Sequence, residues 1–463
     1  MKKLSMLDLA FFMVESEASP KHVAGLMRCK KPRGAKADYA RKLVEELKTF
    51  DEVNEPFNLV INFLGLKGPQ WEYCTNFSIE NHIFYHRSRR AISWLDAKEQ
   101  VALLHEPMLD RSKPLWEFHV IDNILGAQFA VYFKLHHAYA DGVTMTSWLS
   151  RSLGKTPDAS ALNPVWALPQ PRGLKRRGSQ PSLLSTARRL GATAFETALA
   201  AGGIAKLGAQ QFLERTGMTR EAVALMFSTP RDTPMSGSAS PGRGVATSSI
   251  EMSRIMALKA QTCSTLNHVA LSCIDGAMHK YLAARGIVLD HPVSIQMPVN
   301  LRNGDSGKSG SKLGNKIGIT LVDLAQPTDD PYRRLREIGY KLRNVKNQVA
   351  NVPGDSFEQF TVLAAGVSEV IDKLNLTDRL PSNGHAVVSN VPGPPELLYL
   401  KDSKVERMYP ISTLSPGLRL NITMFSYAGL LHFGLVATQD LEHLQDLADL
   451  IVDEFQLLED AIK

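Results

Sequence analysis

Residues 128–142 read QFAVYFKLHHAYADG, a strand-like stretch that ends in two histidines. Its large apolar side chains share one parity, at Phe129, Val131, Phe133 and Leu135. This period of two predicts a strand that is buried on one face. Continuing the parity turns His137 toward the protein interior and leaves His136 on the other face.

The histidine pair is followed by Asp141 and Gly142, where the strand pattern ends. Asp141 is predicted to be the N-cap of a helix that begins near Val143. A neutral imidazole held inside a fold can take a proton from an alcohol, thiol or amine near neutral pH. His137 is therefore the candidate general base, with His136 in support and Asp141 as an orienting carboxylate.

Two other interpretations of the histidines stay open. A histidine at a strand end is often an ordinary core residue. Two adjacent histidines also resemble a metal site, but neighbours on a strand point to opposite faces and do not easily share one ion. No Cys-x-x-Cys or His-Glu-x-x-His pattern accompanies them, so we expect no metal.

The composition is that of a globular protein with room for two domains. The chain has 463 residues, of which 44% are hydrophobic and 22% charged, and this excludes a wholly disordered or collagen-like chain. It lacks the run of about 18 apolar residues that a membrane span needs and a signal-peptide core, so we expect a cytoplasmic protein. The net charge of +6 allows an anionic partner, but no nucleotide-binding or nucleic-acid recognition motif is present.

Helical and strand-like periods alternate along the chain, which predicts an α/β fold of the α+β kind, with mixed sheets flanked by helices. Asp38 is expected to cap the first of the helices, which are placed at residues 39–50, 97–105, 253–262, 267–285 and 441–458. Strands are expected at residues 114–122, 129–137, 292–297, 317–322, 386–388, 419–423 and 431–437.

Breaker-rich segments at residues 155–181 and 228–249 divide the chain. Between them, an Ala- and Leu-rich helix at residues 183–215 either packs between the domains or lies on a lipid surface. We expect the active site between the two halves, since small-molecule sites favour domain boundaries. The expected division is an N-terminal domain at 1–155, a crossover at 156–245 and a C-terminal domain at 246–463.

Several motifs besides HHxxxDG resemble the bacterial wax ester synthase/diacylglycerol acyltransferase family, which is built like chloramphenicol acetyltransferase. They follow the family order from about residue 4 to 458. The matching blocks are LSMLD at 4–8, Glu15-Ser16, PKHV at 20–23, PLWE at 114–117, NHV at 267–269, PVNLR at 298–302, Gly314-Asn315, SNVPGP at 389–394, LNIT at 420–423 and Ser426-Tyr427. One departure is His268, which stands where the family usually has aspartate after the asparagine.

The resemblance implies two chloramphenicol-acetyltransferase-like domains joined by a long crossover. It also implies an O-acyltransferase that moves a fatty acyl group from acyl-coenzyme A to a long-chain fatty alcohol or to diacylglycerol. His137 would take the proton of the acceptor hydroxyl. Asn267 would stabilise the oxyanion or position a substrate, with a helix N-cap as the equal alternative. Acyl-coenzyme A is then a co-substrate, with no permanently bound cofactor and no metal.

The resemblance further implies substrate-binding roles for Trp116, Glu15, Gly142, Asn315, Ser389 and Asn390. Trp116 would wall the acyl channel, although a tryptophan in a strand is also ordinary core. Glu15 stands among apolar residues and is expected by default to face solvent. Asp141 is expected to pair with Arg302.

Three alternative functions remain. A condensation domain of a peptide synthetase shares the HHxxxDG motif, a complex-lipid acyltransferase would esterify hydroxylated lipids, and a non-catalytic protein of the same fold would bind lipid surfaces. Substrates this apolar partition into lipid, so we expect peripheral contact with the inner face of the cell membrane and with lipid inclusions.

Overall fold

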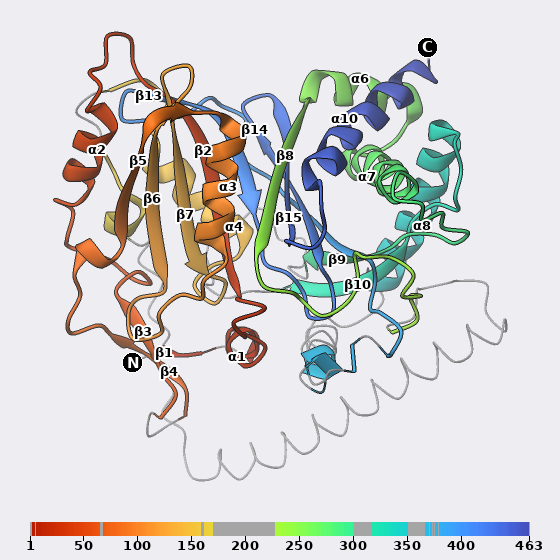
Figure 1. Ribbon diagram of the computed structural model, residues 1–463, viewed down its shortest axis with the longest axis horizontal. Helices are drawn as coiled ribbons and strands as arrows, with labels where there is room; N and C mark the ends of the chain where they lie inside the picture. The colour runs from red at the N-terminus through yellow and green to blue at the C-terminus, as the bar shows by residue number, and fades with distance from the viewer. Residues whose placement is uncertain are drawn as a thin grey trace.

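Two six-stranded sheets lie next to each other, with helices packed around them (Figure 1). The coordinates are those of a computed structural model. The structure describes residues 2–4, 6–64, 68–158, 162–169, 227–300, 317–350 and 366–462 except 370, 373, 375 and 378. The helix expected at 183–215 and the motif residues Arg302 and Asn315 lie outside these ranges.

The N-terminal sheet has the strand order β12-β13-β2-β7-β6-β5. Its strands are β2 (His22–Lys30), β5 (Ile83–Ile92), β6 (Trp116–Ile124), β7 (Gln128–His136), β12 (Tyr399–Leu400) and β13 (Ser403–Ile411). Strand β7 pairs antiparallel with β2 on one side and with β6 on the other, so it is an inner strand.

The predicted one-sided burial of β7 is wrong, because all of its residues are buried. Phe129, Val131, Phe133 and Leu135 do share a face, and they pack in one hydrophobic cluster. Ala130 and Tyr132 pack in a second cluster on the opposite face. An inner strand that is covered on both faces shows no polar face in its sequence.

The C-terminal sheet has the strand order β10-β9-β11-β14-β15-β8. Its strands are β8 (Arg243–Glu251), β9 (Ser294–Asn300), β10 (Ile317–Asp323), β11 (Ala386–Val391), β14 (Leu420–Tyr427) and β15 (Leu430–Thr438). Strand β11 runs parallel to both β9 and β14, whereas the other pairs are antiparallel. The sheet is therefore mixed, which confirms the predicted fold class. Strand β8 includes residues 243–249, which were predicted to belong to a breaker-rich segment between the domains.

The remaining elements surround these sheets. A small sheet has the order β1-β4-β3, with β1 at Lys2–Lys3, β4 at Gln70–Tyr73 and β3 at Leu59–Asn62. The helices are α1 (Met6–Met13), α2 (Tyr39–Leu47), α3 (Trp94–His105), α4 (Gly142–Ser152), α6 (Met252–Thr262), α7 (Leu266–Ala283), α8 (Pro331–Ala350) and α10 (Leu444–Asp460), with short 3₁₀ helices at Ile79–Asn81 and Val165–Ala167.

Helix ends depart from the expected positions where side chains compete for them. Helix α3 begins at Trp94, earlier than predicted, because Ser93 and Asp96 form a reciprocal capping box. Asp38 precedes α2 as expected but makes no side-chain cap. Its carboxylate lies 3.0 Å from the ammonium of Lys42 instead.

The C-terminal half of the chain contributes strands to the N-terminal sheet. Strand β13 belongs to the C-terminal half, yet it pairs antiparallel with β2 of the N-terminal sheet from Lys404 to Ile411. In Figure 1 these strands lie side by side next to the second sheet. The division at residues 155 and 246 stays a prediction, and the N-terminal sheet takes strands from both sides of it.

Candidate active site

The two histidines are held by backbone hydrogen bonds where β7 ends. The amide of His136 donates to the carbonyl of Leu115 at 2.9 Å, and the amide of His137 donates to the carbonyl of Lys21 at 2.9 Å. These bonds come from different segments, one before β6 and one before β2. The histidine loop is therefore fixed from two directions.

His137 faces a cavity between the two sheets. One face of its imidazole stacks on Phe11 of α1, with ring centroids 4.3 Å apart. Burial lowers the pKa of His137 to about 4, and the nearby Asp141 carboxylate opposes this shift. The imidazole is therefore neutral near pH 7, as general-base chemistry requires.

His136 is fully buried and is not among the cavity-lining residues. Its ring stacks on Phe12, and its Nδ1 accepts the Ala138 amide at 3.1 Å. Nδ1 therefore carries no proton, and the ring proton of the neutral form lies on Nε2, which is 3.4 Å from a Glu15 carboxylate oxygen. His136 lies beside the site as a structural neighbour of His137.

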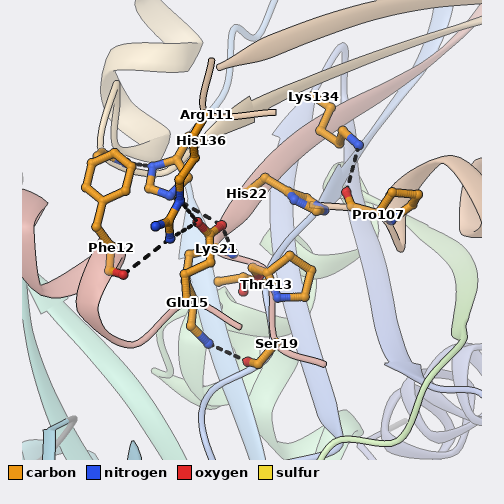
Figure 2. A network of polar contacts seen from close by, with 12 residues as sticks. Phe12, Glu15, Ser19, Lys21, His22, Pro107, Arg111, Lys134, His136 and Thr413 are labelled. Carbon is orange, nitrogen blue, oxygen red and sulfur yellow. Dashed lines mark hydrogen bonds and ion pairs between the residues drawn. The ribbon is translucent and has the colours of Figure 1, made fainter. Parts of the chain in front are cut away.

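Glu15 lies inside the protein, although it was predicted by default to face solvent. Its side chain is 2% exposed, and a carboxylate oxygen lies 2.8 Å from the Arg111 guanidinium. Figure 2 shows these two side chains beside His136. It also accepts the amide of Lys21 at 3.0 Å. Burial alone would raise the pKa of Glu15, but His136, the Lys21 amide and Arg111 together lower it to about 2. Glu15 is thus a charged anchor for His136 and does not line the cavity.

Asp141 is the N-cap of α4, as predicted. Its carboxylate accepts the amide of Thr144 at 2.8 Å and the Thr144 hydroxyl at 2.7 Å. The adjacent Gly142 allows close contact between the halves, since a Cβ there would lie 2.8 Å from a methyl group of Val391 in β11. The predicted ion pair with Arg302 lies outside the described residues.

The cavity has a volume of about 480 Å³ and takes its walls from both sheets. Most of the lining is apolar, including Phe11, Leu26, Met27, Phe133, Met145, Leu149, Ile319, Val387, Val391, Met408, Ile411 and Phe425. Gly25 of β2 adds an open position, because a Cβ there would meet no atom within 4 Å. Apolar walls around one histidine suit a long hydrocarbon substrate.

The fold places some of the predicted substrate-binding residues at the cavity and others away from it. Gly142, Ser389 and Asn390 line the cavity. Trp116 is fully buried in the core, where its indole nitrogen donates to the Phe57 carbonyl at 2.8 Å. Its position agrees with the core interpretation. Asn315 lies outside the described residues.

Asn267 is exposed in the first turn of α7 and does not line the cavity itself, but it contacts a residue that does. Its side-chain oxygen accepts the amide of the cavity-lining Asn390 at 2.7 Å. The alternative role as a helix cap is wrong, because Thr265 is the N-cap. His268 completes that cap, and its Nδ1 accepts the Thr265 amide at 3.3 Å. Thus His268 supplies the acceptor that a carboxylate would supply in a capping box.

Several cavity residues were not predicted from the sequence. Phe11 lies next to the quoted N-terminal block without belonging to it, and Gly25 has no local signal at all. Asn421 and Thr423 belong to the quoted LNIT block, but no role was assigned to them. Within the described ranges, no group of three His, Cys, Asp or Glu side chains is arranged to hold a metal ion.

Solved structures share this architecture. The wax ester synthase/diacylglycerol acyltransferase from Marinobacter aquaeolei VT8 superposes with a TM-score of 0.74 at 24% identity, covering 99% of both chains. The first condensation domain of the CDA synthetase superposes with a TM-score of 0.56 at 12% identity, covering 100% of this chain and 97% of that one. The fold therefore defines a two-sheet class that includes acyltransferases and condensation domains.

Sequence comparisons narrow this class. A model described as the wax ester synthase/diacylglycerol acyltransferase catalytic domain matches residues 4–270, and the C-terminal domain of the same family matches residues 313–459. The Mycobacterium tuberculosis protein named "Probable diacyglycerol O-acyltransferase tgs2" is 30% identical over 98% of both chains. The O-acyltransferase WSD of Acinetobacter baylyi is 28% identical, covering 100% of this chain and 98% of its own. The chain belongs to the wax ester synthase/diacylglycerol acyltransferase family, and it is an O-acyltransferase.

Proposed function

We propose that the protein transfers a fatty acyl group from acyl-coenzyme A to the hydroxyl of a long-chain alcohol or of diacylglycerol. The products are a wax ester or triacylglycerol and free coenzyme A. The observation that carries this proposal is a neutral His137 facing an apolar cavity between the two sheets. The names of the relatives, wax ester synthase and diacylglycerol O-acyltransferase, support both acceptors.

The chemistry is a direct attack of the acceptor on the thioester. His137 takes the proton of the acceptor hydroxyl while the hydroxyl oxygen bonds to the thioester carbonyl carbon. The carbon–sulfur bond then breaks, and the same proton passes from His137 to the coenzyme A sulfur. Asp141 orients the loop as the α4 cap, and its carboxylate favours the positive imidazole that forms between the two transfers.

The test measures coenzyme A release from palmitoyl-coenzyme A with hexadecanol or dioleoylglycerol as acceptor, with lipid products separated by thin-layer chromatography. We expect acceptor-dependent release by the unmodified protein. His137→Ala should lower kcat by about 10²–10⁴-fold, because a positioned base contributes that much.

The matched control is His86→Ala, in the edge strand β5. Its kcat should equal that of the unmodified protein. Full release by His137→Ala would contradict the general-base role. No release with either acceptor would favour a carrier-bound or complex-lipid substrate.

The location of the enzyme is a second proposal: it works at the surface of membranes and lipid inclusions. In the described part of the chain, no helix is both long enough and apolar enough to cross a bilayer. Exposed apolar side chains occur on α1 and after β3, where Leu64 is 94% exposed and Met13 and Phe63 are also exposed. Phe63 packs edge-on against Phe12, which stacks on His136, so the two segments meet next to the histidine network. The other docking candidate, at residues 183–213, lies outside the described residues.

Vesicle flotation tests this location. Leu64→Glu should reduce the fraction bound to anionic vesicles, since it places a charge where apolar surface would enter the lipid. Val288→Glu is the control, because Val288 is a comparably exposed apolar residue after α7. No flotation of the unmodified protein would contradict the docking proposal.

A further inference from the structure

A row of polar side chains crosses the cavity on the C-terminal sheet. Strands β11 and β14 run parallel, with Ser389 beside Thr423. Ser389, Asn421 and Thr423 all line the cavity, whereas the intervening Val388 and Ile422 pack into the core behind the sheet. Ser389 shares its face of β11 with Val391, the residue against Gly142 of the histidine loop. The row and α4 therefore line the same cavity.

The hydrogen bonds in this row have one direction. Asn421 Nδ2 donates to the carbonyl of Thr413 at 2.8 Å, and this fixes the amide because a carbonyl oxygen only accepts. Asn421 Oδ1 therefore faces Thr423 and accepts its hydroxyl hydrogen at 2.8 Å. A hydroxyl group has one hydrogen, so in the 2.8 Å contact with Ser389 it is Thr423 Oγ1 that accepts.

Ser389 is the last member of the row, and its hydrogen is already used. Its Oγ presents a lone pair to the cavity. Asn421 and Thr423 are buried, so reversing the row would leave the Asn421 oxygen without its donor in a place shielded from water. Buried polar groups without partners are strongly disfavoured, which holds the row in this direction.

A lone pair on Ser389 selects among the substrate groups. The tetrahedral oxyanion is an acceptor, so this oxygen does not stabilise it. The acceptor hydroxyl has one hydrogen, and His137 takes it. Fatty alcohols and diacylglycerols have no other hydrogen-bond donor. The donors that remain near the thioester are the amide N–H groups of the pantetheine arm of coenzyme A.

We propose that Ser389 Oγ accepts a hydrogen bond from a pantetheine amide N–H and so positions the thioester against His137. This inference rests on the proposed use of acyl-coenzyme A. Ser389 then binds the acyl donor, and Thr423 and Asn421 keep the hydrogen of the Ser389 hydroxyl pointed away from the cavity. At the end opposite Ser389, the row is joined to the segment that holds the histidine loop. The Thr413 hydroxyl donates to the Pro20 carbonyl at 2.7 Å, and the amide of His137 donates to the carbonyl of the next residue, Lys21.

The experiment compares two short thioesters, palmitoyl-N-acetylcysteamine and its N-methyl analogue, which lacks the amide hydrogen. In the unmodified protein, N-methylation should raise KM by about 2- to 10-fold, the range for one neutral hydrogen bond. In Ser389→Ala the two thioesters should have equal KM. Ser389→Thr keeps the oxygen and should restore the difference. Ser150→Ala, which removes an exposed α4 hydroxyl outside the cavity, is the control.

Three kinetic outcomes would overturn the assignment. A KM difference that persists in Ser389→Ala shows that the amide binds elsewhere. A fall in kcat with unchanged KM values would indicate an oxyanion role, and a raised KM for the alcohol alone would indicate an acceptor site. If the unmodified protein transfers no acyl group, the proposed function fails, and calorimetry with coenzyme A still tests the assignment. In calorimetry, Ser389→Ala should raise the Kd for coenzyme A by about 2- to 10-fold. Equal Kd values for the two proteins would overturn the assignment.

Discussion

The ring of Phe11 stacks on the imidazole of His137, with centroids 4.3 Å apart and planes 16° apart. The next residue repeats the contact on the next histidine, because Phe12 stacks on His136 with centroids 4.2 Å apart. Two consecutive aromatic residues of α1 thus cover two consecutive histidines. Since these rings replace water at the imidazoles, they contribute to the burial that lowers the pKa of His137.

The pH dependence of the reaction follows from that pKa. His137 acts as a base only when neutral, so activity should be lost as the pH falls through about 4. With an unperturbed histidine, activity would be lost at about pH 6.5. We expect kcat/KM to fall about tenfold per pH unit below this limit. The measurement is a pH–rate profile with circular dichroism at each pH, and an acid limb near 6.5 would contradict it.

Removing the ring of Phe11 should shift the acid limb of the pH–rate profile. Phe11→Ala admits water to one face of His137, so the pKa should rise toward its usual value and the acid limb should shift to higher pH. Phe11→Leu, which keeps much of the apolar volume, should shift it less. Identical profiles for all three proteins would show that Phe11 does not control the protonation of His137.

The close contact between Gly142 of α4 and Val391 of β11 should leave no room for a side chain at position 142. Gly142→Ala places a methyl group 2.8 Å from Val391 and should lower the free energy of unfolding by about 1–3 kcal/mol through overpacking. Val391→Ala removes the clashing methyl groups. The double variant should therefore be more stable than the sum of the two single effects predicts. Chemical denaturation checks this, and strict additivity would contradict the contact.

Chain-length selectivity should depend on Gly25. Its open Cβ position lies in the cavity wall, so Gly25→Val fills substrate space rather than core. We expect the ratio of kcat/KM for palmitoyl- over octanoyl-coenzyme A to fall by about tenfold. Gly25→Ala should show a smaller change in the same direction. Unchanged ratios with unchanged thermal stability would place the acyl chain elsewhere.

The cap of α7 explains the histidine at position 268. His268→Asp keeps an acceptor for the Thr265 amide, so stability should change little. His268→Ala removes that acceptor and should lower the free energy of unfolding by about 1 kcal/mol. Denaturant unfolding of the two variants checks this. A larger loss for aspartate than for alanine would show that another contact of His268 matters more.

Some of the site could be predicted because the information is local. The alternation before His136, the turn at Asp141 and the α4 cap all depend on residues close in sequence, and these elements form as predicted. The matching motif blocks also identified the family correctly. The burial of Glu15 could not be predicted, because its partner Arg111 lies 96 residues away.

The strand–loop–helix that carries His137 and the family to which the chain belongs could both be predicted from the amino-acid sequence, because short ordered patterns record them. Three features appear first in the folded protein: the burial of Glu15 beside His136, the pairing of β13 with the N-terminal sheet, and the directed row of hydrogen bonds that ends at Ser389. Strand pairing can join partners that lie hundreds of residues apart, as for β2 and β13, and the direction of a hydrogen bond depends on which side chains the fold brings together, as for Ser389 and Thr423. A local pattern contains no information about such partners.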